Sequence, residues 1–310
     1  NDSGAGLFVL DKGVAAEMGE ALGKVVTRQI ALDGSDVGQA FEAWLPPVGS
    51  KPAPVKHDRK DPFNIIYSSG TTGTPKGIVQ SHGMRWRHLA PRADGIGYGP
   101  DAVGFISTPL YSNTTLVCFF PTLAGGGTMV MLPKFDVLKW LKAAQDNRVT
   151  HAMLVPVQYR RLLEHPDFDK YDLSSFQMKF ATSAPFPAEL KKQAIERWPG
   201  GLTEYYGMTE GGGGFMLQAH LYPDKLHTVG LPSPGAVIKL IDEEGNEVGP
   251  GEVGEIIGRS PAVISGYHNQ PGKTSEAEWW SPDGLRFIRT GDVGRFDEDG
   301  FLTLMDRKKD

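Results

Sequence analysis

The sequence predicts an α/β fold in which parallel or mixed sheets are flanked by helices, together with a small antiparallel, barrel-like subdomain. Strand-like and helix-like apolar patterns alternate over residues 6–206, which is typical of parallel strands joined by right-handed helical crossovers. This rhythm changes near Val229, after which short strands are separated by turns. The 310 residues, of which 40% are apolar, are enough to bury a substantial core in more than one domain.

Residues 1–50 predict a partial α/β subdomain. A strand over 6–10, a helix over 14–22 and a strand over 25–32 form a βαβ unit, which implies a parallel sheet. A polar, proline-bearing connector follows at 46–61, and its charged residues indicate a solvated loop.

Residues 51–228 predict a larger α/β subdomain, whose ligands would bind at the carboxyl ends of its strands. We expect strands at 63–66, 78–79, 103–107, 128–132, 151–155, 177–182 and 202–206, and helices at 82–92, 113–123, 137–145, 157–164 and 188–198.

Residues 229–305 predict the antiparallel β subdomain. Asp299-Gly300 is a strong hairpin signal, and one helix is expected at 273–279. The expected strands lie at 236–242, 254–259, 286–289 and 301–305.

Composition excludes several classes of function. A net charge of −5 argues against nucleic acid as the main partner, because duplex binding leaves a basic footprint. No apolar run approaches the length of a transmembrane helix, and residues 1–4 do not resemble the start of a signal peptide. The single cysteine, Cys118, lies in an apolar run and is expected in the core. These features favour a cytoplasmic protein.

Residues 67–77, with the sequence YSSGTTGTPKG, combine hydroxyl side chains, glycines and one lysine between two apolar strands. This composition fits either a solvated turn or a cradle for phosphate, in which backbone N–H groups, hydroxyls and an ammonium group bind the anion. A P-loop NTPase is excluded because Lys76 is followed by Gly77 and β-branched residues instead of Ser/Thr and a helix.

Three further motifs are rich in turn-forming or charged residues, and each has a plain structural interpretation. Residues 206–210, YGMTE, follow a strand and precede four glycines, so they fit a glycine-rich turn or a site with an aromatic ring for a base and a carboxylate for Mg²⁺. Residues 289–294, RTGDVG, fit an Asx turn or an aspartate that binds ribose hydroxyls. The charged run at 306–310 alone would read as a frayed terminus.

In this order, the four motifs resemble those of the adenylate-forming superfamily, and the chain is similar to its acyl-CoA and aryl-CoA ligases, such as 4-coumarate and feruloyl ligases. The resemblance implies the large N-terminal domain of such an enzyme, with ATP, Mg²⁺ and coenzyme A as cofactors or substrates. It also implies an incomplete chain, because family members carry long segments before and after the matching part.

The resemblance also implies roles for particular residues. Lys76, Thr209 and Glu210 would be catalytic, Glu210 would hold Mg²⁺, and Lys309 would be the hinge of a small C-terminal domain. The remaining nucleotide contacts would be Ser68, Ser69, Gly70, Thr71, Thr72 and Gly73 at the phosphates, Ser183, Ala184, Pro185 and Tyr206 at adenine, Asp292 and Arg307 at ribose, and Gly207 next to Tyr206.

The resemblance places the acyl group among parts of four segments, 111–115, 155–157, 180–184 and 211–215, with aromatic or medium- to long-chain acids preferred. Ser112 stands where many family members have a histidine after an aromatic residue, so that histidine's role is not supplied here. The expected pocket residues are Tyr111, Ser112, Val155, Phe180, Gly211, Gly212 and Phe215.

The implied reaction has two steps, adenylation of a carboxylate and transfer of the acyl group to coenzyme A. It needs no catalytic triad or metal cluster, and none is evident: His82 and His151 are expected to be structural. The partners would be a carboxylic acid, ATP and coenzyme A, with no nucleic acid and no transmembrane segment. Two alternatives stay open, an adenylation domain that loads a carrier protein and a nucleotide-binding fragment without turnover.

Overall fold

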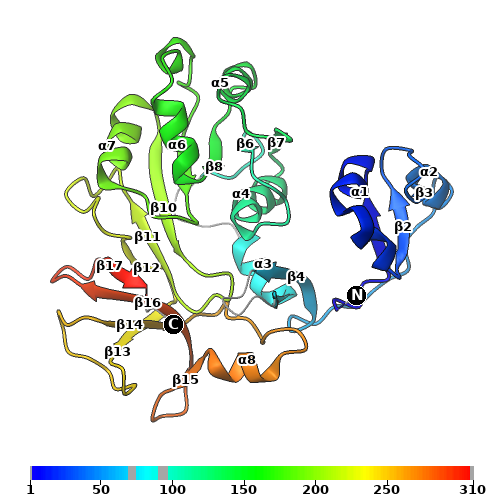
Figure 1. Cartoon of the computed structure of the whole chain (residues 1–310). Helices are drawn as coiled ribbons and strands as arrows, with labels where there is room; N and C mark the ends of the chain where they lie inside the picture. The colour runs from blue at the N-terminus through cyan, green and yellow to red at the C-terminus, as the bar shows by residue number, and fades with distance from the viewer. Residues whose placement is uncertain (1, 69–74, 90–96, 308–310) are drawn as a thin grey trace. The chain divides into compact units, whose positions relative to one another are not determined.

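The computed structural model describes residues 2–68, 75–89 and 97–307 (Figure 1). The chain divides into two compact units, Asn1–His57 and Asp58–Asp310, which are described separately. The first unit therefore ends seven residues later than the expected boundary at residue 50.

A small parallel sheet forms the first unit. Strand β1 pairs with β2, and β2 with β3, as the βαβ pattern predicted. The expected helix at 14–22 is shifted: the Asp11 carboxylate caps it at the Val14 N–H, so it starts earlier, and it ends before Gly19, whose φ of +50° is not helical. The elements are β1 (Leu7–Leu10), α1 (Lys12–Met18), a 3₁₀ helix (Gly19–Lys24), β2 (Arg28–Ala31), β3 (Gln39–Ala40) and α2 (Phe41–Trp44).

A seven-stranded mixed sheet organises the second unit, in the order β12-β11-β10-β9-β8-β6-β7. Strands β6 to β10 are parallel, while β11 and β12 pair antiparallel at one edge. The strands are β6 (Val103–Ile106), β7 (Thr128–Met131), β8 (His151–Leu154), β9 (Met178–Ala181), β10 (Gly201–Gly207), β11 (Gly214–Gln218) and β12 (Leu231–Pro232).

Alternating side chains of this sheet build two cores. Phe105 and Ala181 point to a large core with Trp140, whereas their neighbours Ile106 and Phe180 point to a second core with Cys118. Helices α5, α6 and α7 therefore cover one face and α4 the other. Their bounds are α4 (Asn113–Ala124), α5 (Val137–Asp146), α6 (Pro156–Leu163) and α7 (Ala188–Arg197), with a 3₁₀ helix at Phe168–Lys170.

A buried ion pair anchors β10 to α7. Lys191 and Glu204 are 2% and 5% exposed, and they pair with each other, while Lys191 Nζ also donates to the carbonyls of Leu226 and Thr228. Burial raises the pKa of Glu204 and lowers that of Lys191, because both charges are removed from water. Strand β10 is thereby fixed just before it reaches Tyr206 and Gly207.

The glycine-rich motif near residue 70 is carried by a hairpin, as expected. Strand β4 (Pro62–Ser68) pairs antiparallel with β5 (Lys76–Ser81), so that Ser68 faces Lys76, and α3 (His82–Leu89) follows. Residues 69–74 between the strands lie outside the described part of the chain.

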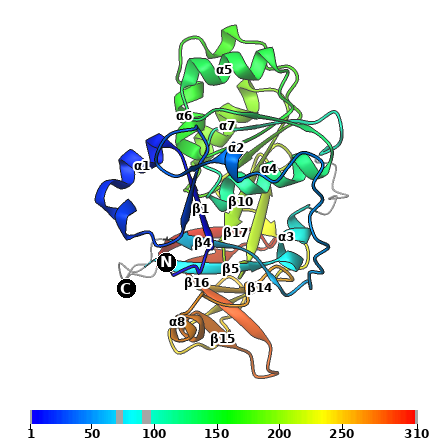
Figure 2. The ribbon, with the colours of Figure 1, turned by 90° about the vertical axis from the view of Figure 1, so that its right-hand side faces the viewer.

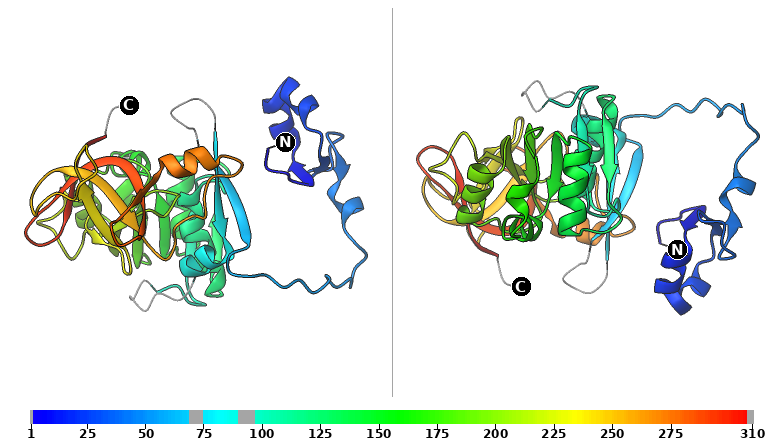
Figure 3. Two further views of the ribbon diagram at one scale, coloured as in Figure 1. Left: turned by 90° about the horizontal axis from the view of Figure 1, so that it is seen from below. Right: turned by 90° about the horizontal axis from the view of Figure 1, so that it is seen from above.

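An antiparallel five-stranded sheet forms the last part of the chain. In Figures 1 and 2 it lies below the large sheet, and the view from below in Figure 3 looks onto its strands, coloured yellow to red. The first half of β16 pairs with β15 and its second half with β17. The elements are β13 (Val237–Ile241), β14 (Gly254–Arg259), α8 (Pro271–Glu276), β15 (Glu278–Trp280), β16 (Arg286–Phe296) and β17 (Leu302–Arg307).

Two predictions of local structure in this sheet can be judged directly. The hairpin at Asp299-Gly300 is confirmed, since it joins β16 to β17. The expected helix over 273–279 is wrong at its end, because Trp279 belongs to β15, where it pairs with Phe287 and donates from Nε1 to the Gly245 carbonyl at 3.0 Å. Pairing with a neighbouring strand thus outweighs the local helical pattern.

Candidate functional site

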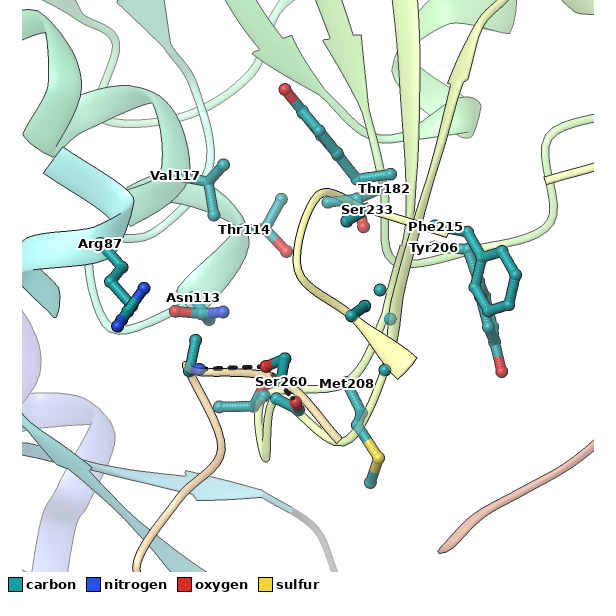
Figure 4. A pocket seen from close by; sticks show the side chains of 18 of the residues that line it. Arg87, Asn113, Thr114, Val117, Thr182, Tyr206, Met208, Phe215, Ser233 and Ser260 are labelled. Carbon is teal, nitrogen blue, oxygen red and sulfur yellow. Dashed lines mark hydrogen bonds between the residues drawn. The ribbon is translucent and has the colours of Figure 1, made fainter. Parts of the chain in front are cut away.

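A cavity of about 740 Å³ lies where β9 and β10 end, against loops of the antiparallel sheet (Figure 4). This is the edge of the sheet at which ligands were expected. Its lining comprises Arg87 from α3; Asn113, Thr114 and Val117 from α4; Thr182, Ser183, Tyr205, Tyr206, Gly207, Met208, Thr209, Gly211, Gly213, Gly214 and Phe215 around β9, β10 and β11; and Ser233, Pro234, Ala236, Ser260, Pro261 and Ala262.

Tyr206 joins two motifs that are distant in the sequence. Its hydroxyl donates to Asp292 Oδ2 at 2.6 Å, and its ring lies 5.7 Å from that of Phe215. The backbone N–H of Asp292 donates to Thr290 Oγ1, so a local turn holds the aspartate while its carboxylate faces the tyrosine. Arg307 lies opposite Asp292 in the register of β16 and β17, but its side chain is outside the described part of the structure.

Tyr267 joins two further motifs. Its hydroxyl donates to Glu210 Oε1 at 2.8 Å, and Lys76 Nζ lies 5.2 Å from the centre of its ring. Burial, and then the negative charge of Glu210, raise the pKa of Tyr267. Glu210 and Lys76 are therefore neighbours of one aromatic residue, although 134 positions (210 minus 76) separate them in the sequence.

The donor set at Glu210 can be compared with the needs of Mg²⁺. Glu210 is 8% exposed, and one of its two carboxylate oxygens accepts the Tyr267 hydroxyl. Within residues 2–68, 75–89 and 97–307, no group of three or more His, Cys, Asp or Glu side chains could hold a metal ion. A single carboxylate is the donor that Mg²⁺ commonly takes from a protein when phosphates and water supply its other ligands, so Glu210 fits this role.

A buried polar network ties the β4–β5 hairpin to the end of β10. Arg85 is 1% exposed, and its guanidinium donates to Asn64 Oδ1 at 2.9 Å, to Asn113 Oδ1 at 2.8 Å and to Gln80 Oε1. Gln80 in turn donates from Nε2 to the Thr209 carbonyl at 3.1 Å. Burial lowers the pKa of Arg85 to about 10.

Ser183 lies on the cavity wall in a left-handed backbone conformation, with φ of +79°. Its hydroxyl forms a hydrogen bond with the Thr114 hydroxyl, which connects the end of β9 to α4. A non-glycine residue in this region is strained, and such strain concentrates at functional sites. Ala184 and Pro185, which were expected beside Ser183, are exposed and are not part of the cavity lining.

The four glycines after Glu210 allow close approach of the two sheets. A Cβ on Gly211, whose φ is +72°, would lie 2.0 Å from the Ala262 carbonyl oxygen, and one on Gly212 would lie 2.4 Å from Ile288 Cβ. Gly211 lines the cavity, whereas Gly212 faces Ile288. The glycines therefore allow the two sheets to pack closely, and they also leave room in the cavity.

The expected acyl residues are only partly brought together. Gly211 and Phe215 line the cavity, but Tyr111 is 81% exposed and Phe180 lies in the core with Cys118. Ser112, Val155 and Gly212 also lie outside the lining. Of the nucleotide residues, Ser69, Gly70, Thr71, Thr72 and Gly73, with the hinge residue Lys309, fall outside the described part of the chain.

Sequence reasoning missed Tyr267 and Arg87, which shape the site, and it expected Asn113 only as part of the segment 111–115 near the acyl group. Tyr267 follows a proline-containing loop and belongs to none of the four motifs. Arg87 and Asn113 were expected on helices, but a short helical pattern does not tell which of its polar side chains faces a cavity.

A family model described as AMP-binding enzyme matches residues 1–268. The chain is 34% identical over 253 residues to a feruloyl-CoA synthase of Amycolatopsis sp, covering 79% of this chain and 49% of that protein. It is also 34% identical over 251 residues to a medium/long-chain fatty acid–CoA ligase of Mycobacterium tuberculosis, covering 80% of this chain and 43% of that protein. The chain thus spans about half the length of these curated relatives.

Solved structures share the fold. The amide bond synthetase McbA from Marinactinospora thermotolerans matches with a TM-score of 0.86 and 31% identity, over 99% of this chain and 61% of that one. ATP-bound MatB from Rhodopseudomonas palustris matches with a TM-score of 0.80 and 29% identity, over 100% of this chain and 60% of that one. In the described part of the chain, no helix has the length and apolar character needed to cross a membrane.

Proposed function

Because the chain belongs to the AMP-binding enzyme family, we propose that the full-length protein is an ATP-dependent carboxylate–CoA ligase. The observation that carries this proposal is the convergence of separate motifs at the ends of β9 and β10. Tyr206 is hydrogen-bonded to Asp292, and Glu210 shares Tyr267 with Lys76. The first pair has groups suited to the nucleoside of a nucleotide, and the second pair has groups suited to its phosphates.

Tyr206 and Asp292 would bind the nucleoside. The tyrosine ring offers a flat surface for adenine. The Asp292 carboxylate accepts a hydrogen bond from Tyr206, and a carboxylate has the acceptor chemistry that the two ribose hydroxyls need. Ser183 and Gly207, which line the same cavity, would lie at the edge of the base, and Arg307 would add a contact to ribose.

Lys76, Ser68, Thr209 and Glu210 would act on the phosphates. Lys76 supplies a mobile positive charge at the base of the glycine-rich loop, and Ser68 faces it across the hairpin. Glu210 would hold Mg²⁺, which would neutralise phosphate charge. Gln80 fixes the Thr209 carbonyl, which orients this turn toward the cavity.

In the proposed reaction, cleavage of a phosphoanhydride bond of ATP drives the formation of an acyl-adenylate. A carboxylate oxygen of the acid attacks the α-phosphorus of ATP, the bond from that phosphorus to the bridging oxygen breaks, and pyrophosphate leaves. The sulfur of coenzyme A, after losing its proton to water, then attacks the carbonyl carbon; a C–S bond forms, the bond from that carbon to the phosphate oxygen breaks, and AMP leaves. In both steps the contribution of this chain is positioning and charge stabilisation.

The acid is proposed to be aromatic or medium- to long-chain. Val117, Phe215 and Ala262 give the cavity apolar surface, which would favour an apolar acyl body. The relatives named for feruloyl and for medium- or long-chain fatty acyl substrates support the same range.

The test uses the full-length protein with ATP, Mg²⁺, coenzyme A and a panel of carboxylic acids. Mass spectrometry should detect AMP and an acyl-CoA thioester in equal amounts, and only when an acid is present. Acid-dependent formation of AMP without a coenzyme A thioester would indicate that the acyl acceptor is another thiol or amine, such as that of a carrier protein. Absence of AMP with every acid would contradict the ligase proposal.

A further inference from the structure

The described residues that line the cavity carry one formal charge, and it is positive. Among those residues Arg87 is the only one that is an aspartate, glutamate, lysine or arginine. Its guanidinium forms no hydrogen bond or ion pair with any other residue that the structure describes. Among the described lining residues no carboxylate neutralises this cation, so an anionic ligand group would meet no negative charge from them.

Asn113 adds a second donor beside Arg87. An arginine side chain can only donate hydrogen bonds, so Asn113 must present its oxygen to Arg85, at 2.8 Å from Nη1. This contact leaves the Nδ2 group, which makes no hydrogen bond to a side chain or backbone group in residues 2–68, 75–89 and 97–307. Figure 4 shows this nitrogen directed into the cavity.

The buried residue Arg85 fixes the orientation of the Asn113 side chain. Arg85 is 1% exposed and is held at the same time by Asn64 Oδ1 and Gln80 Oε1. Rotating the Asn113 amide by half a turn would place its NH₂ group against a buried guanidinium, which would be unfavourable because both groups are donors. Arg87 and Asn113 thus present only donors to the cavity.

These donors lie across the cavity from Tyr206, whose ring is assigned to adenine. Figure 4 shows Arg87 and Asn113 on one side of the cavity, and Tyr206 and Phe215 on the opposite side. Val117 and Thr114 lie on the same side as the two donors. A ligand that reaches from the nucleotide to Arg87 would therefore need two anionic or acceptor ends joined by a largely apolar body.

We propose that Arg87 and Asn113 bind the second carboxylate of a dicarboxylic acid, whose first carboxylate is the one that is adenylated. The inference rests on the proposed function and specifies its substrate class. A guanidinium offers paired N–H groups to a carboxylate, and the asparagine amide adds a third donor. A monocarboxylic acid of equal length would leave these donors without a partner in the bound state.

The experiment compares matched acids in the full-length protein. The pairs are hexanoate with adipate, octanoate with suberate, and benzoate with terephthalate, and the readout is kcat/KM for acid-dependent AMP release. In at least one pair the dicarboxylate should be preferred by about 10-fold or more, the effect expected for charge-assisted hydrogen bonds. Arg87→Met should abolish that preference by lowering kcat/KM for the dicarboxylate alone, and Arg87→Lys should keep part of it.

Arg160→Met serves as the matched control. Arg160 is an exposed arginine on α6 that does not line the cavity, so its loss removes the same charge elsewhere and should leave the preference unchanged. Because Arg87 is itself exposed, both variants should keep the melting temperature of the parent protein.

The possible outcomes separate this inference from the proposed function. Equal kcat/KM for both members of every pair, or an equal loss for both in Arg87→Met, would overturn the dicarboxylate inference and leave the ligase intact. The second result would place Arg87 at the reacting carboxylate or the nucleotide. If no acid supports AMP release, the ligase proposal fails, and calorimetric titration of the parent protein and Arg87→Met with suberate and terephthalate decides the subsite. Tighter binding to the parent would support it, and equal or absent binding would overturn it.

Discussion

Replacing Asp292 with alanine should weaken nucleotide binding, because it removes the acceptor of the Tyr206 hydroxyl and the proposed partner of the ribose hydroxyls. Hydrogen bonds to a charged group contribute about 1.5–3 kcal/mol each, but water partly replaces those of an accessible carboxylate. We therefore expect a loss of about 1 to 3 kcal/mol, which corresponds to a dissociation constant about 5- to 150-fold higher. Asp292→Asn, which keeps an acceptor but not the charge, should lie between alanine and the parent.

Tyr206→Phe completes a double-mutant cycle. It keeps the ring for adenine and removes only the hydroxyl that orients Asp292, so it should weaken binding by about 0.5 to 1.5 kcal/mol. If the hydroxyl acts through Asp292, the double variant should bind no more weakly than Asp292→Ala alone. Calorimetric titration with AMP and with a non-hydrolysable ATP analogue measures all three variants. Unchanged affinity in Asp292→Ala, or fully additive losses, would refute the arrangement.

Three further predictions concern groups away from the nucleotide. Cys118 is fully buried and its pKa is raised to about 11 by burial, so a thiol reagent should modify it only after denaturation, and rapid modification of the native protein would contradict this placement. Lys191→Met should lower the free energy of unfolding in urea by about 3 to 5 kcal/mol, because Glu204 would stay buried without its partner, whereas a loss below ~1 kcal/mol would contradict the ion pair. The hydrogen bond from the Ser35 hydroxyl, and then that from the Lys12 N–H, lower the pKa of Asp33 from 3.8 to about 2. The stabilising effect of this carboxylate should therefore be complete above pH ~4 and disappear as the pH falls through ~2. An NMR titration should show this midpoint and a higher one in Ser35→Ala, whereas an unshifted midpoint in Ser35→Ala would exclude this cause.

The sequence predicted the fold well where local patterns and tertiary structure agree. The alternating strands and helices of the large sheet, the hairpin whose second strand begins at Lys76, and the turn at Asp299-Gly300 all follow from periodicity and turn chemistry. Trp279 shows the opposite case. Its segment has a helical pattern, but pairing with β16 places it in a strand, and such pairing depends on residues that are distant in sequence.

The candidate site was predictable only as a set of motifs. Their composition indicated a nucleotide, but not that Tyr206 and Asp292 would be hydrogen-bonded, nor that Tyr267 would lie between Glu210 and Lys76. These contacts arise because the loops of the antiparallel sheet meet the strand ends of the large sheet. The proposed role of Arg87 could not be predicted from the sequence pattern either, because it depends on the lack of carboxylates among the described residues of the cavity lining.

The central claim is that this chain carries the site at which a carboxylate is adenylated. The most direct measurement is the exchange of labelled pyrophosphate into ATP by the full-length protein, since exchange requires reversible formation of an acyl-adenylate and is independent of the acceptor. We predict exchange that depends on both Mg²⁺ and a carboxylic acid, and that falls strongly in Lys76→Met. Exchange that is equally fast without any acid, or no exchange with any acid, would contradict this account.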